Sequence, residues 1–251
     1  MKYICIIPAR YASSRFPGKP LAMIGGKIMI RRVYEQVLKA SDDVVVATDD
    51  ERIYNAVREF GGRVVMTSAA HRSGTDRCRE AYTLCGSDAD VIINVQGDEP
   101  FIAPSQIEAL KNCFNDPEVE IATLARPFDP SRGFEALFDP NTPKVVMDDN
   151  MNALYFSRSI IPYVRGHEWK EWLDNARFFT HVGLYGYRTA VLDRITRMPQ
   201  SDLEKAESLE QLRWLQGGCK IRVALTDEPT IGIDTPEDLE NANRLIASEN
   251  A

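Results

Sequence analysis

Short apolar runs rich in β-branched residues alternate with amphipathic segments in the N-terminal part of this chain, and this order most constrains its fold. Such runs occupy residues 3–7, 44–48, 64–66 and 91–95. Runs of this length and type are typical of strands that are buried on both faces of a sheet. Because the segments between the first three runs have apolar residues at helical spacing, we predict a parallel sheet with right-handed crossovers.

The rest of the chain continues this mixture of strands and helices. We predict strands at 120–125, 181–188 and 221–225, a β-hairpin from 145–147 and 153–156, and helices that begin at Pro104, span 206–215 and follow Thr235. Residues 126–143 contain four prolines and little periodicity. We therefore expect a single domain, 1–251, whose two halves meet near this segment.

The composition argues against several classes of protein. A formal net charge of −7 is unfavourable for a general nucleic-acid or anionic-membrane partner. The sequence contains no apolar run that could span a bilayer and no signal peptide at its start. Its five cysteines form no CxxC pair, which fits a reducing compartment better than a disulfide scaffold or a zinc site. We expect a cytoplasmic protein with no nucleic-acid or membrane partner.

The loop after the first predicted strand combines small residues with cations. Pro8 ends the strand because it has no N–H for a sheet ladder, and Arg10, Arg15 and Lys19 follow it. Small residues let backbone N–H groups approach a ligand closely, and α/β sheets usually bind ligands at the carboxyl ends of their strands. In an acidic chain, three cations at this place predict a polyanionic ligand rather than a solvated basic loop.

One acid lies where a metal ion could be held, and helix capping leaves a second acid unexplained. Asp98 follows a buried strand and Gly97, whereas Asp234 directly precedes Thr235, the expected N-cap of the last helix. An ordinary turn residue is the alternative for Asp98, and strand alternation predicts that Glu99 points elsewhere. With only three histidines, far apart, a histidine-based metal site is disfavoured. Carboxylates together with phosphates indicate Mg²⁺.

Two further segments are candidates for ligand binding. Residues 71–77 predict the start of a helix that is capped by Ser73 or Thr75, with His71 left as a surface loop residue. On the predicted strand 181–188, His181 and Tyr185 share a face. Gly183 leaves open space between them that suits a sugar, although a lone histidine on a strand is more often structural.

The order of these motifs resembles that of the sugar-acid cytidylyltransferases. The resemblance runs nearly end to end and rests on PAR, SRFPGKPL, HRSGTDR, NVQGDEP, ALYFSRSIIP, HVGLYGYR, LEQLR and GIDTPEDLE. Each motif alone is weak, but together they are specific. They are similar to those of the family members that act on 3-deoxy-manno-octulosonate (Kdo). The resemblance implies a Rossmann-like nucleotide-diphospho-sugar transferase fold, with a mixed, mainly parallel sheet flanked by helices and a smaller β-rich lobe.

The resemblance also implies an activity and an assembly. The activity is Mg²⁺-dependent transfer of CMP from CTP to the anomeric hydroxyl of Kdo, giving CMP-Kdo and pyrophosphate for lipopolysaccharide synthesis. About 1–125 would bind the nucleotide, about 126–251 would bind the sugar and dimerise, and the protein would be a homodimer. Two alternatives stay open. One is an enzyme of the same fold for another sugar acid, such as an amino-substituted octulosonate or a neuraminate, and the other is a non-catalytic nucleotide-sensing module.

The resemblance assigns roles to particular residues. The catalytic set is Arg10, Lys19, Asp98 and Asp234, of which the two aspartates are the metal ligands. The nucleotide-binding set is Pro8, Ala9, Arg10, Lys19, Ser73, Gly74, Arg77, Gln96 and Gly97. The sugar-binding set is Arg15, Gln96, Arg158, His181, Tyr185, Glu210 and Gln211. Residues 162–177 match the family least, and they could be a mobile cover or part of a dimer contact.

Overall fold

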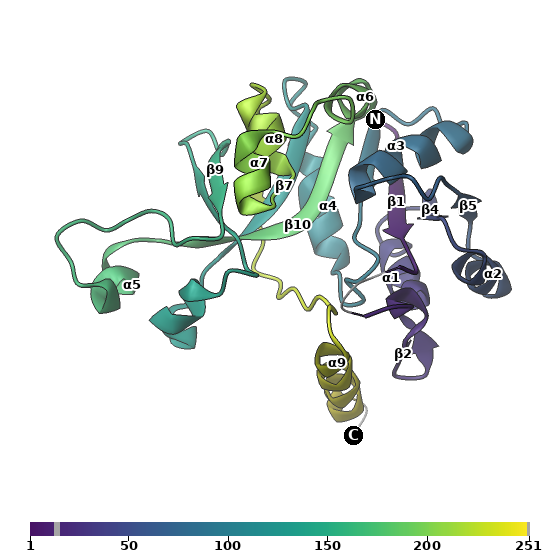
Figure 1. Ribbon diagram of the computed structural model, residues 1–251, viewed down its shortest axis with the longest axis horizontal. Coiled ribbons are helices and arrows are strands. Elements are labelled where there is room, and N and C mark those ends of the chain that lie inside the picture. The colour runs from purple at the N-terminus through teal and green to yellow at the C-terminus, as the bar shows by residue number, and fades with distance from the viewer. Residues whose placement is uncertain (13–15, 250–251) are drawn as a thin grey trace. The chain divides into compact units, whose positions relative to one another are not determined.

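The computed structural model describes residues 1–12 and 16–249, and its chain forms two compact units (Figure 1). Unit 1 comprises Met1–Glu108, Gly186–Thr196 and Pro229–Ala251, and unit 2 comprises Ala109–Tyr185 and Arg197–Glu228. The chain thus leaves unit 1 and returns to it twice. The two consecutive halves expected from the sequence differ from this interleaved arrangement.

Unit 1 is built on a parallel sheet. Strand β1 (Tyr3–Ala9) pairs in parallel with both β4 (Val44–Thr48) and β6 (Val91–Asn94), and β5 (Val64–Met66) pairs in parallel with β4. Most side chains of β1, β4 and β6 are buried, as expected for a parallel sheet that is covered on both faces. The strands and the parallel order predicted for this region are confirmed. The prediction that Pro8 ends the first strand is wrong, because β1 continues to Ala9 and Pro8 pairs with Ala47 of β4.

Helices pack on this sheet in unit 1. Helix α3 (Gly74–Leu84) packs on β1 and β6, α1 (Met29–Val37) packs on β1, and α2 (Glu51–Glu59) packs on β4 and β5. Besides α9, described below, the other helices with residues in this unit are η1 (Lys19–Leu21), α4 (Pro104–Cys113) and α6 (Thr189–Ile195). Helix α1 begins only after β3 (Lys27–Ile28), which pairs with β2 (Met23–Ile24) as a small antiparallel sheet.

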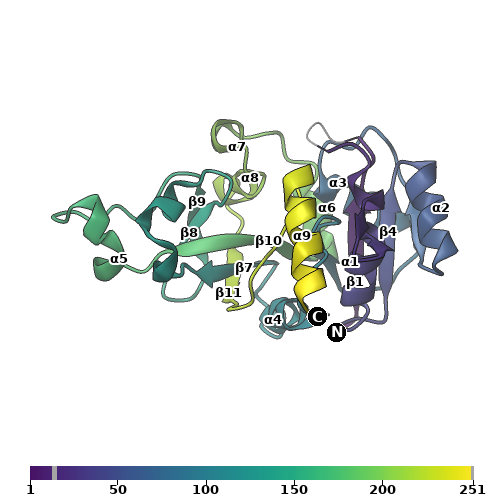
Figure 2. The ribbon, with the colours of Figure 1, turned by 90° about the horizontal axis from the view of Figure 1, so that it is seen from below.

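The last helix, α9 (Pro236–Glu249), belongs to unit 1 and explains why the chain returns there. Ala242 of α9 is buried in one cluster with Ile24, Met29 and Ile233. Figure 2 shows α9, in yellow, beside α1. The turn that leads into α9, with Asp234, is therefore held against residues from the beginning of the chain.

The strands of unit 2 form a mixed sheet. Strand β11 (Ile221–Leu225) pairs in parallel with β7 (Ile121–Pro127), and β10 (Phe179–Arg188) lies on the other side of β7. Strands β8 (Lys144–Met147) and β9 (Ala153–Ser157) form the predicted antiparallel hairpin, and β8 also pairs with β10. The hairpin and the strand order along the chain are confirmed.

The helix predicted at 206–215 is wrong in its bounds. The structure has two helices, α7 (Asp202–Glu207) and α8 (Gln211–Gln216), because Ser208 adopts a left-handed conformation with φ 51° between them. Across this break the Arg213 guanidinium lies 2.6 Å from the Glu204 carboxylate. Glu207 and Glu210 therefore do not share a helix face.

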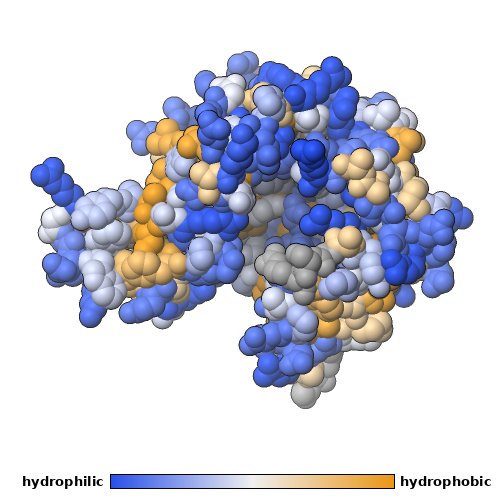
Figure 3. Space-filling view, viewed as in Figure 1, coloured by the Kyte–Doolittle hydropathy of each residue, from blue (hydrophilic) through white to orange (hydrophobic). Residues whose placement is uncertain are grey.

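The remaining part of unit 2 is rich in aromatic side chains. Its short helices are η2 (Pro130–Arg132), η3 (Phe134–Phe138), η4 (Trp169–Glu171) and α5 (Trp172–Asn175). Phe128, Phe134, Leu137, Trp172 and Phe178 form a buried cluster here. On the face seen in Figure 3, apolar surface in orange gathers between β9 and α5. Among the described residues, no helix has the length and apolar character needed to cross a membrane.

Candidate active site

A cavity of about 270 Å³ in unit 1 gathers most of the predicted nucleotide-binding residues. Its walls come from the end of β1, from η1, from the start of α3, from the turn after β6 and from the turn before α9. The lining residues are Pro8, Arg10, Lys19, Pro20, His71, Arg72, Ser73, Gly74, Arg77, Gln96, Gly97, Asp98 and Asp234. Of the predicted nucleotide-binding set, only Ala9 is not a lining residue, since its side chain is buried in β1.

One ammonium group joins the two predicted metal ligands inside this cavity. Lys19 Nζ donates to Asp98 Oδ2 at 2.7 Å and to Asp234 Oδ1 at 3.0 Å. Burial of Lys19 disfavours its charged form, but the charges and hydrogen bonds of Asp98 and Asp234 outweigh burial and raise the pKa of Lys19. Two carboxylates from turns far apart in sequence thus converge on one cation.

The backbone explains why these turns meet. A Cβ atom on Gly97 would lie 2.8 Å from the carbonyl oxygen of Pro8, so only glycine lets the turn after β6 lie against the end of β1. Ile233 N then donates to the carbonyl oxygen of Asp98 at 2.9 Å, which ties the second acidic turn to the first. The positions of Asp98 and Asp234 are therefore set by these two main-chain contacts.

Glu99 is a third acid near this pair, but it does not line the cavity, in agreement with the prediction that it points elsewhere. Burial, with repulsion from Asp98 and Asp234, raises the pKa of Glu99 to about 7. Its Oε2 atom is buried without a hydrogen-bond partner among the described residues. Strand alternation is not the reason for this orientation, because β6 ends at Asn94 and Glu99 lies in the following turn.

The carboxylates fit a divalent cation that takes its other ligands from a substrate. Within residues 1–12 and 16–249, no group of three or more His, Cys, Asp or Glu side chains could hold a metal ion alone. Asp98 and Asp234 are instead a pair whose charges already need a cation between them, a need that Lys19 meets in this structure. Mg²⁺ commonly binds through one or two carboxylates plus phosphate oxygens and water.

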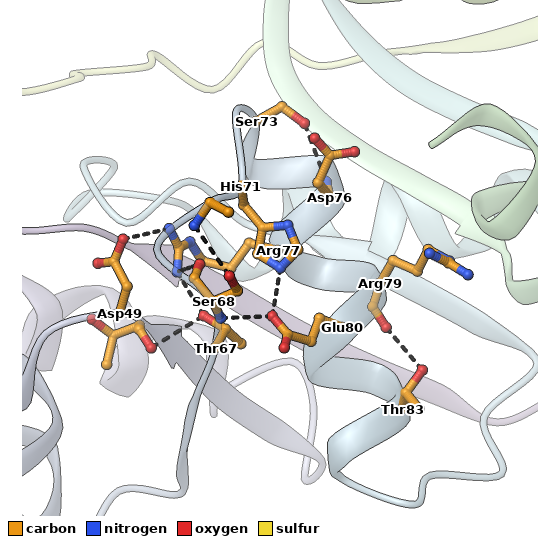
Figure 4. A network of polar contacts seen from close by, with 12 residues as sticks. Asp49, Thr67, Ser68, His71, Ser73, Asp76, Arg77, Arg79, Glu80 and Thr83 are labelled. Atoms are coloured by element: carbon orange, nitrogen blue, oxygen red, sulfur yellow. Dashed lines mark hydrogen bonds and ion pairs between the residues drawn. The ribbon is translucent and has the colours of Figure 1, made fainter. Parts of the chain in front are cut away.

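A polar network builds the wall of the cavity beside α3 (Figure 4). Arg77 is only 4% exposed, and its guanidinium donates to Asp49 Oδ2 at 2.8 Å and to Thr67 Oγ1 at 2.6 Å. Ser73 caps α3, since its Oγ accepts from Asp76 N at 3.1 Å, which confirms one of the two predicted caps. Arg77 therefore lines the cavity while it joins the ends of β4 and β5 to α3.

His71 belongs to this wall, and its interpretation as a surface loop residue is wrong. It lines the cavity, and its Nε2 atom lies 2.5 Å from Glu80 Oε2, an atom that also accepts from Ser68 N at 2.8 Å. Burial opposes ionisation of Glu80, but the hydrogen bonds from Ser68 and His71 prevail and lower its pKa. Because these partners are distant in sequence, the local loop pattern could not predict them.

Three of the predicted sugar-binding residues lie together in unit 2. The rings of His181 and Tyr185 are 5.4 Å apart between centroids, and the charge of Glu210 acts on Tyr185. Gln211 follows Glu210 at the start of α8, and its Nε2 atom is buried with no hydrogen-bond partner in the described part of the chain. These side chains therefore form a set of hydrogen-bonding groups, in which the amide of Gln211 has donor capacity left among the described residues.

His181 and Tyr185 are held in their neutral forms. Burial lowers the pKa of His181 to about 3, and its Nε2 atom lies 3.0 Å from Thr123 Oγ1. Burial raises the pKa of Tyr185 well above its ordinary value, and the nearby charge of Glu210 adds to this effect. Such groups are suited to bind hydroxyls by hydrogen bonds rather than to transfer protons near neutral pH.

The other predicted sugar ligands are placed differently. Arg158 lines a separate cavity of about 750 Å³ in unit 2, and its guanidinium donates to the carbonyl oxygens of Pro140 and Glu207, each at 2.6 Å. Gln96 lines the cavity of unit 1. The position predicted for Arg15 lies outside the described residues.

Comparison with known proteins places this chain in a family. The family model for Cytidylyltransferase matches residues 4–221. The chain is 62% identical, over 249 residues, to a protein of Parabacteroides distasonis named 3-deoxy-manno-octulosonate cytidylyltransferase, and the match covers 99% of each chain. The chain belongs to the 3-deoxy-manno-octulosonate cytidylyltransferase family. A protein of the same name from Bacteroides thetaiotaomicron is 60% identical to this cytidylyltransferase over 246 residues, which is 98% of each.

Solved structures agree with this membership. This cytidylyltransferase is similar to a CMP:2-keto-3-deoxy-manno-octonic acid synthetase that was solved in complex with CTP, with a TM-score of 0.90 and 44% identity over 99% of this chain and 100% of that chain. A putative glucose-1-phosphate thymidylyltransferase from Bacillus anthracis has a TM-score of 0.65 at 17% identity, over 97% of this chain and 94% of that chain, and shares the fold alone. The predicted fold class is confirmed.

Proposed function

We propose that this cytidylyltransferase transfers CMP from CTP to the anomeric hydroxyl of Kdo and releases pyrophosphate. The observation that carries the proposal is the cavity of unit 1, where Lys19 lies between Asp98 and Asp234 at hydrogen-bond distance. A site of this charge distribution suits a triphosphate that arrives with a metal ion. Relatives over nearly the whole chain are named for this activity, and one was solved with CTP.

The nucleotide would be held by the walls of that cavity. Arg10 is exposed at the end of β1 and, with Lys19, supplies positive charge for the phosphates. Ser73 and Gly74 lie at the N-terminus of α3, where backbone N–H groups favour polar and anionic groups. The chemistry is an in-line attack by the sugar oxygen on the α-phosphorus, so binding and orientation account for most of the catalysis.

Asp98 and Asp234 would hold the Mg²⁺ ion. When bound, the ion supplies positive charge that stabilises the phosphoryl oxygens during the attack. The ammonium group of Lys19 lies beside both carboxylates. Phosphate oxygens that bind an ion held by these carboxylates would therefore lie within reach of Lys19, which would donate to them.

The sugar acid would be bound by the hydrogen-bonding groups of unit 2. Neutral His181 and Tyr185 suit the hydroxyls of Kdo, and Glu210 can accept from them. The buried Nε2 donor of Gln211 needs an acceptor, since an unsatisfied buried donor is costly. A hydroxyl or carboxylate oxygen of the sugar acid would supply it.

We also propose that the protein acts in the cytoplasm as a homodimer that supplies lipopolysaccharide synthesis. Unit 2 exposes Phe138, Tyr163 and Trp169, which are 57%, 74% and 40% exposed, and side chains of this kind are commonly buried at subunit interfaces. No disulfide joins the five cysteines, all of which lie among the described residues, which suits a reducing compartment. Sedimentation equilibrium tests the dimer, because a single monomeric species would contradict it.

The decisive experiment is an assay of pyrophosphate release with four nucleoside triphosphates, a panel of sugar acids, and Mg²⁺ present or absent. We expect release only with CTP, Kdo and Mg²⁺ together. Release with an 8-amino octulosonate or a neuraminate, and not with Kdo, would show that this other sugar acid is the substrate. CTP binding by calorimetry without release for any sugar acid would favour a nucleotide-sensing module.

A further inference from the structure

We infer that Arg52 and Tyr11 form a stacked pair that positions Lys19 for the nucleotide. The guanidinium carbon of Arg52 lies 3.3 Å from the centroid of the Tyr11 ring. Neither residue lines the cavity of unit 1, so the pair would act through the main chain. The inference rests on the proposed function, because it concerns how Lys19 meets the phosphates of CTP.

The Arg52 side chain is fixed by its own helix. Arg52 Nε donates to Asp50 Oδ1 at 2.9 Å and Arg52 Nη2 donates to Asp50 Oδ2 at 2.7 Å, which is a bidentate pair. Asp50 is in turn the N-cap of α2 and accepts from Arg52 N at 2.9 Å. A bidentate contact fixes the plane of a guanidinium group, so α2 presents a flat, charged surface to Tyr11.

Tyr11 in turn holds Gly18. The carbonyl oxygen of Tyr11 accepts from Gly18 N at 2.9 Å. A Cβ atom on Gly18 would lie 3.0 Å from Cζ of the Tyr11 ring, so that ring packs directly on the Gly18 backbone. Gly18 has φ 72°, a conformation that glycine adopts readily. Any movement of the Tyr11 ring therefore acts on the conformation of Gly18.

Gly18 sets the start of the short helix that carries Lys19. It is the N-cap of η1, and its carbonyl oxygen accepts from Leu21 N at 2.9 Å. Lys19 is the first residue of η1, and α2 also packs against this element. The contacts thus run without interruption from Asp50 through Arg52, Tyr11 and Gly18 to the Lys19 ammonium between the two carboxylates.

The test compares kinetics and CTP binding for Arg52→Ala, Tyr11→Leu and the double variant. We expect each single change to raise the KM for CTP by about two- to fivefold, the range that a cation–π contact of this kind supports. The KM for Kdo should stay the same. Because both changes break one contact, the double variant should be no worse than the worse single variant. Tyr11→Phe, which keeps the ring, should restore the wild-type KM.

Arg58→Ala is the matched control. Arg58 is an exposed arginine on the same helix, so its loss removes the same charge from α2 without touching Tyr11. An Arg52→Ala enzyme that behaves like Arg58→Ala would overturn the inference. So would additive effects in the double variant, or equal increases in the KM values for CTP and Kdo. If the wild-type protein itself fails to turn over CTP and Kdo, the proposed function fails. Calorimetric CTP binding by the same variants then tests the pair separately.

Discussion

At the scale of single residues, one ammonium group joins two acids that lie far apart in sequence. Lys19 is 79 positions from Asp98 and 215 positions from Asp234, yet its nitrogen is within 3.0 Å of an oxygen of each. Neighbouring carboxylates repel each other, and this repulsion favours protonation of one of them unless a cation is present. The site therefore depends on positive charge whether or not a ligand is bound.

Replacement of Lys19 by alanine should damage the use of CTP and leave the fold intact. A charge-assisted hydrogen bond contributes about 1.5–3 kcal/mol, so we expect kcat/KM for CTP to fall about 10- to 100-fold. Steady-state pyrophosphate release measures the change, and far-ultraviolet circular dichroism checks the fold. Wild-type CTP kinetics in a folded Lys19→Ala protein would refute the role of this cation.

Asp98→Asn and Asp234→Asn should each abolish turnover, because an amide cannot supply the negative charge that a metal ion and its phosphate require. The measurement is a Mg²⁺ titration of activity for both variants. Asp42→Asn, which changes an exposed aspartate elsewhere in unit 1, should titrate like the wild type. Normal activity in either site variant would exclude the proposed pair of metal ligands.

Gln211→Met should separate sugar binding from stability. The buried Nε2 atom of Gln211 has no partner among the described residues, so its removal should keep or increase the free energy of unfolding. The KM for Kdo should nevertheless rise about tenfold, the effect of losing one hydrogen bond of about 1.4 kcal/mol. Gln216→Met, an exposed change on the same helix, is the control. A rise in the KM for CTP alone would contradict the assignment.

At the scale of elements, the cap of α9 links stability to the metal site. Thr235 Oγ1 accepts from Asp238 N at 3.2 Å, and Asp238 Oδ2 accepts from Thr235 N at 2.8 Å and from Asp234 N at 3.0 Å. Thr235→Ala should therefore lower the free energy of unfolding by about 1 kcal/mol. It should also increase the Mg²⁺ concentration needed for half-maximal activity. Thr230→Ala, at an exposed position, should do neither.

The elements that could be predicted from the sequence are those with strong local signals. Strands β1, β4 and β6 appear as uninterrupted apolar runs because both of their faces are buried, and Thr235, Pro236 and Asp238 mark the start of α9. The break at Ser208 has no such signal, since serine rarely adopts φ 51° and the apolar spacing continues past it. Local pattern can place an element, but not every residue that interrupts it.

The same limit applies to the candidate site. The cations and acids of the first loop, the turn after β6 and the turn before α9 could be predicted because each follows or precedes a recognisable element. The contribution of Glu99, the His71–Glu80 pair and the Arg52–Tyr11 stack could not be predicted. Each depends on partners that only the folded chain brings together.

At the scale of the whole molecule, the buried His181 makes stability depend on pH. With a folded pKa of about 3, His181 stays neutral on mild acidification, whereas in the unfolded chain it takes up a proton below about pH 6.5. At this histidine the unfolded state then binds more protons, so its contribution to stability falls as the pH falls. Glu99, whose pKa is raised to about 7, acts in the opposite direction over the same range. We therefore expect the loss from His181, about 1–2 kcal/mol between pH 7.5 and pH 5, to appear as a difference between the wild type and His181→Gln in urea unfolding at several pH values.

Variants of two histidines in unit 2 test this assignment. Relative to the wild type, His181→Gln should gain unfolding free energy as the pH falls from 7.5 to 5, whereas His167→Gln, at an exposed position, should follow the wild type. A His181→Gln protein whose unfolding free energy keeps a constant offset from the wild type over this range would show that His181 is not held neutral by the fold.

The interleaved path of the chain has a consequence for the order in which the site can form during translation. Ribosomes synthesise about 5–20 residues per second, so Asp234, 215 positions after Lys19, is made roughly 10–40 s later. During that interval a nascent chain can bring Lys19 beside Asp98 but has only one of the two carboxylates. We expect such a chain to bind CTP and Mg²⁺ poorly even where β1, β4 and β6 have already paired. Nucleotide binding would therefore distinguish a chain that has been translated beyond Asp234 from one whose synthesis stopped earlier.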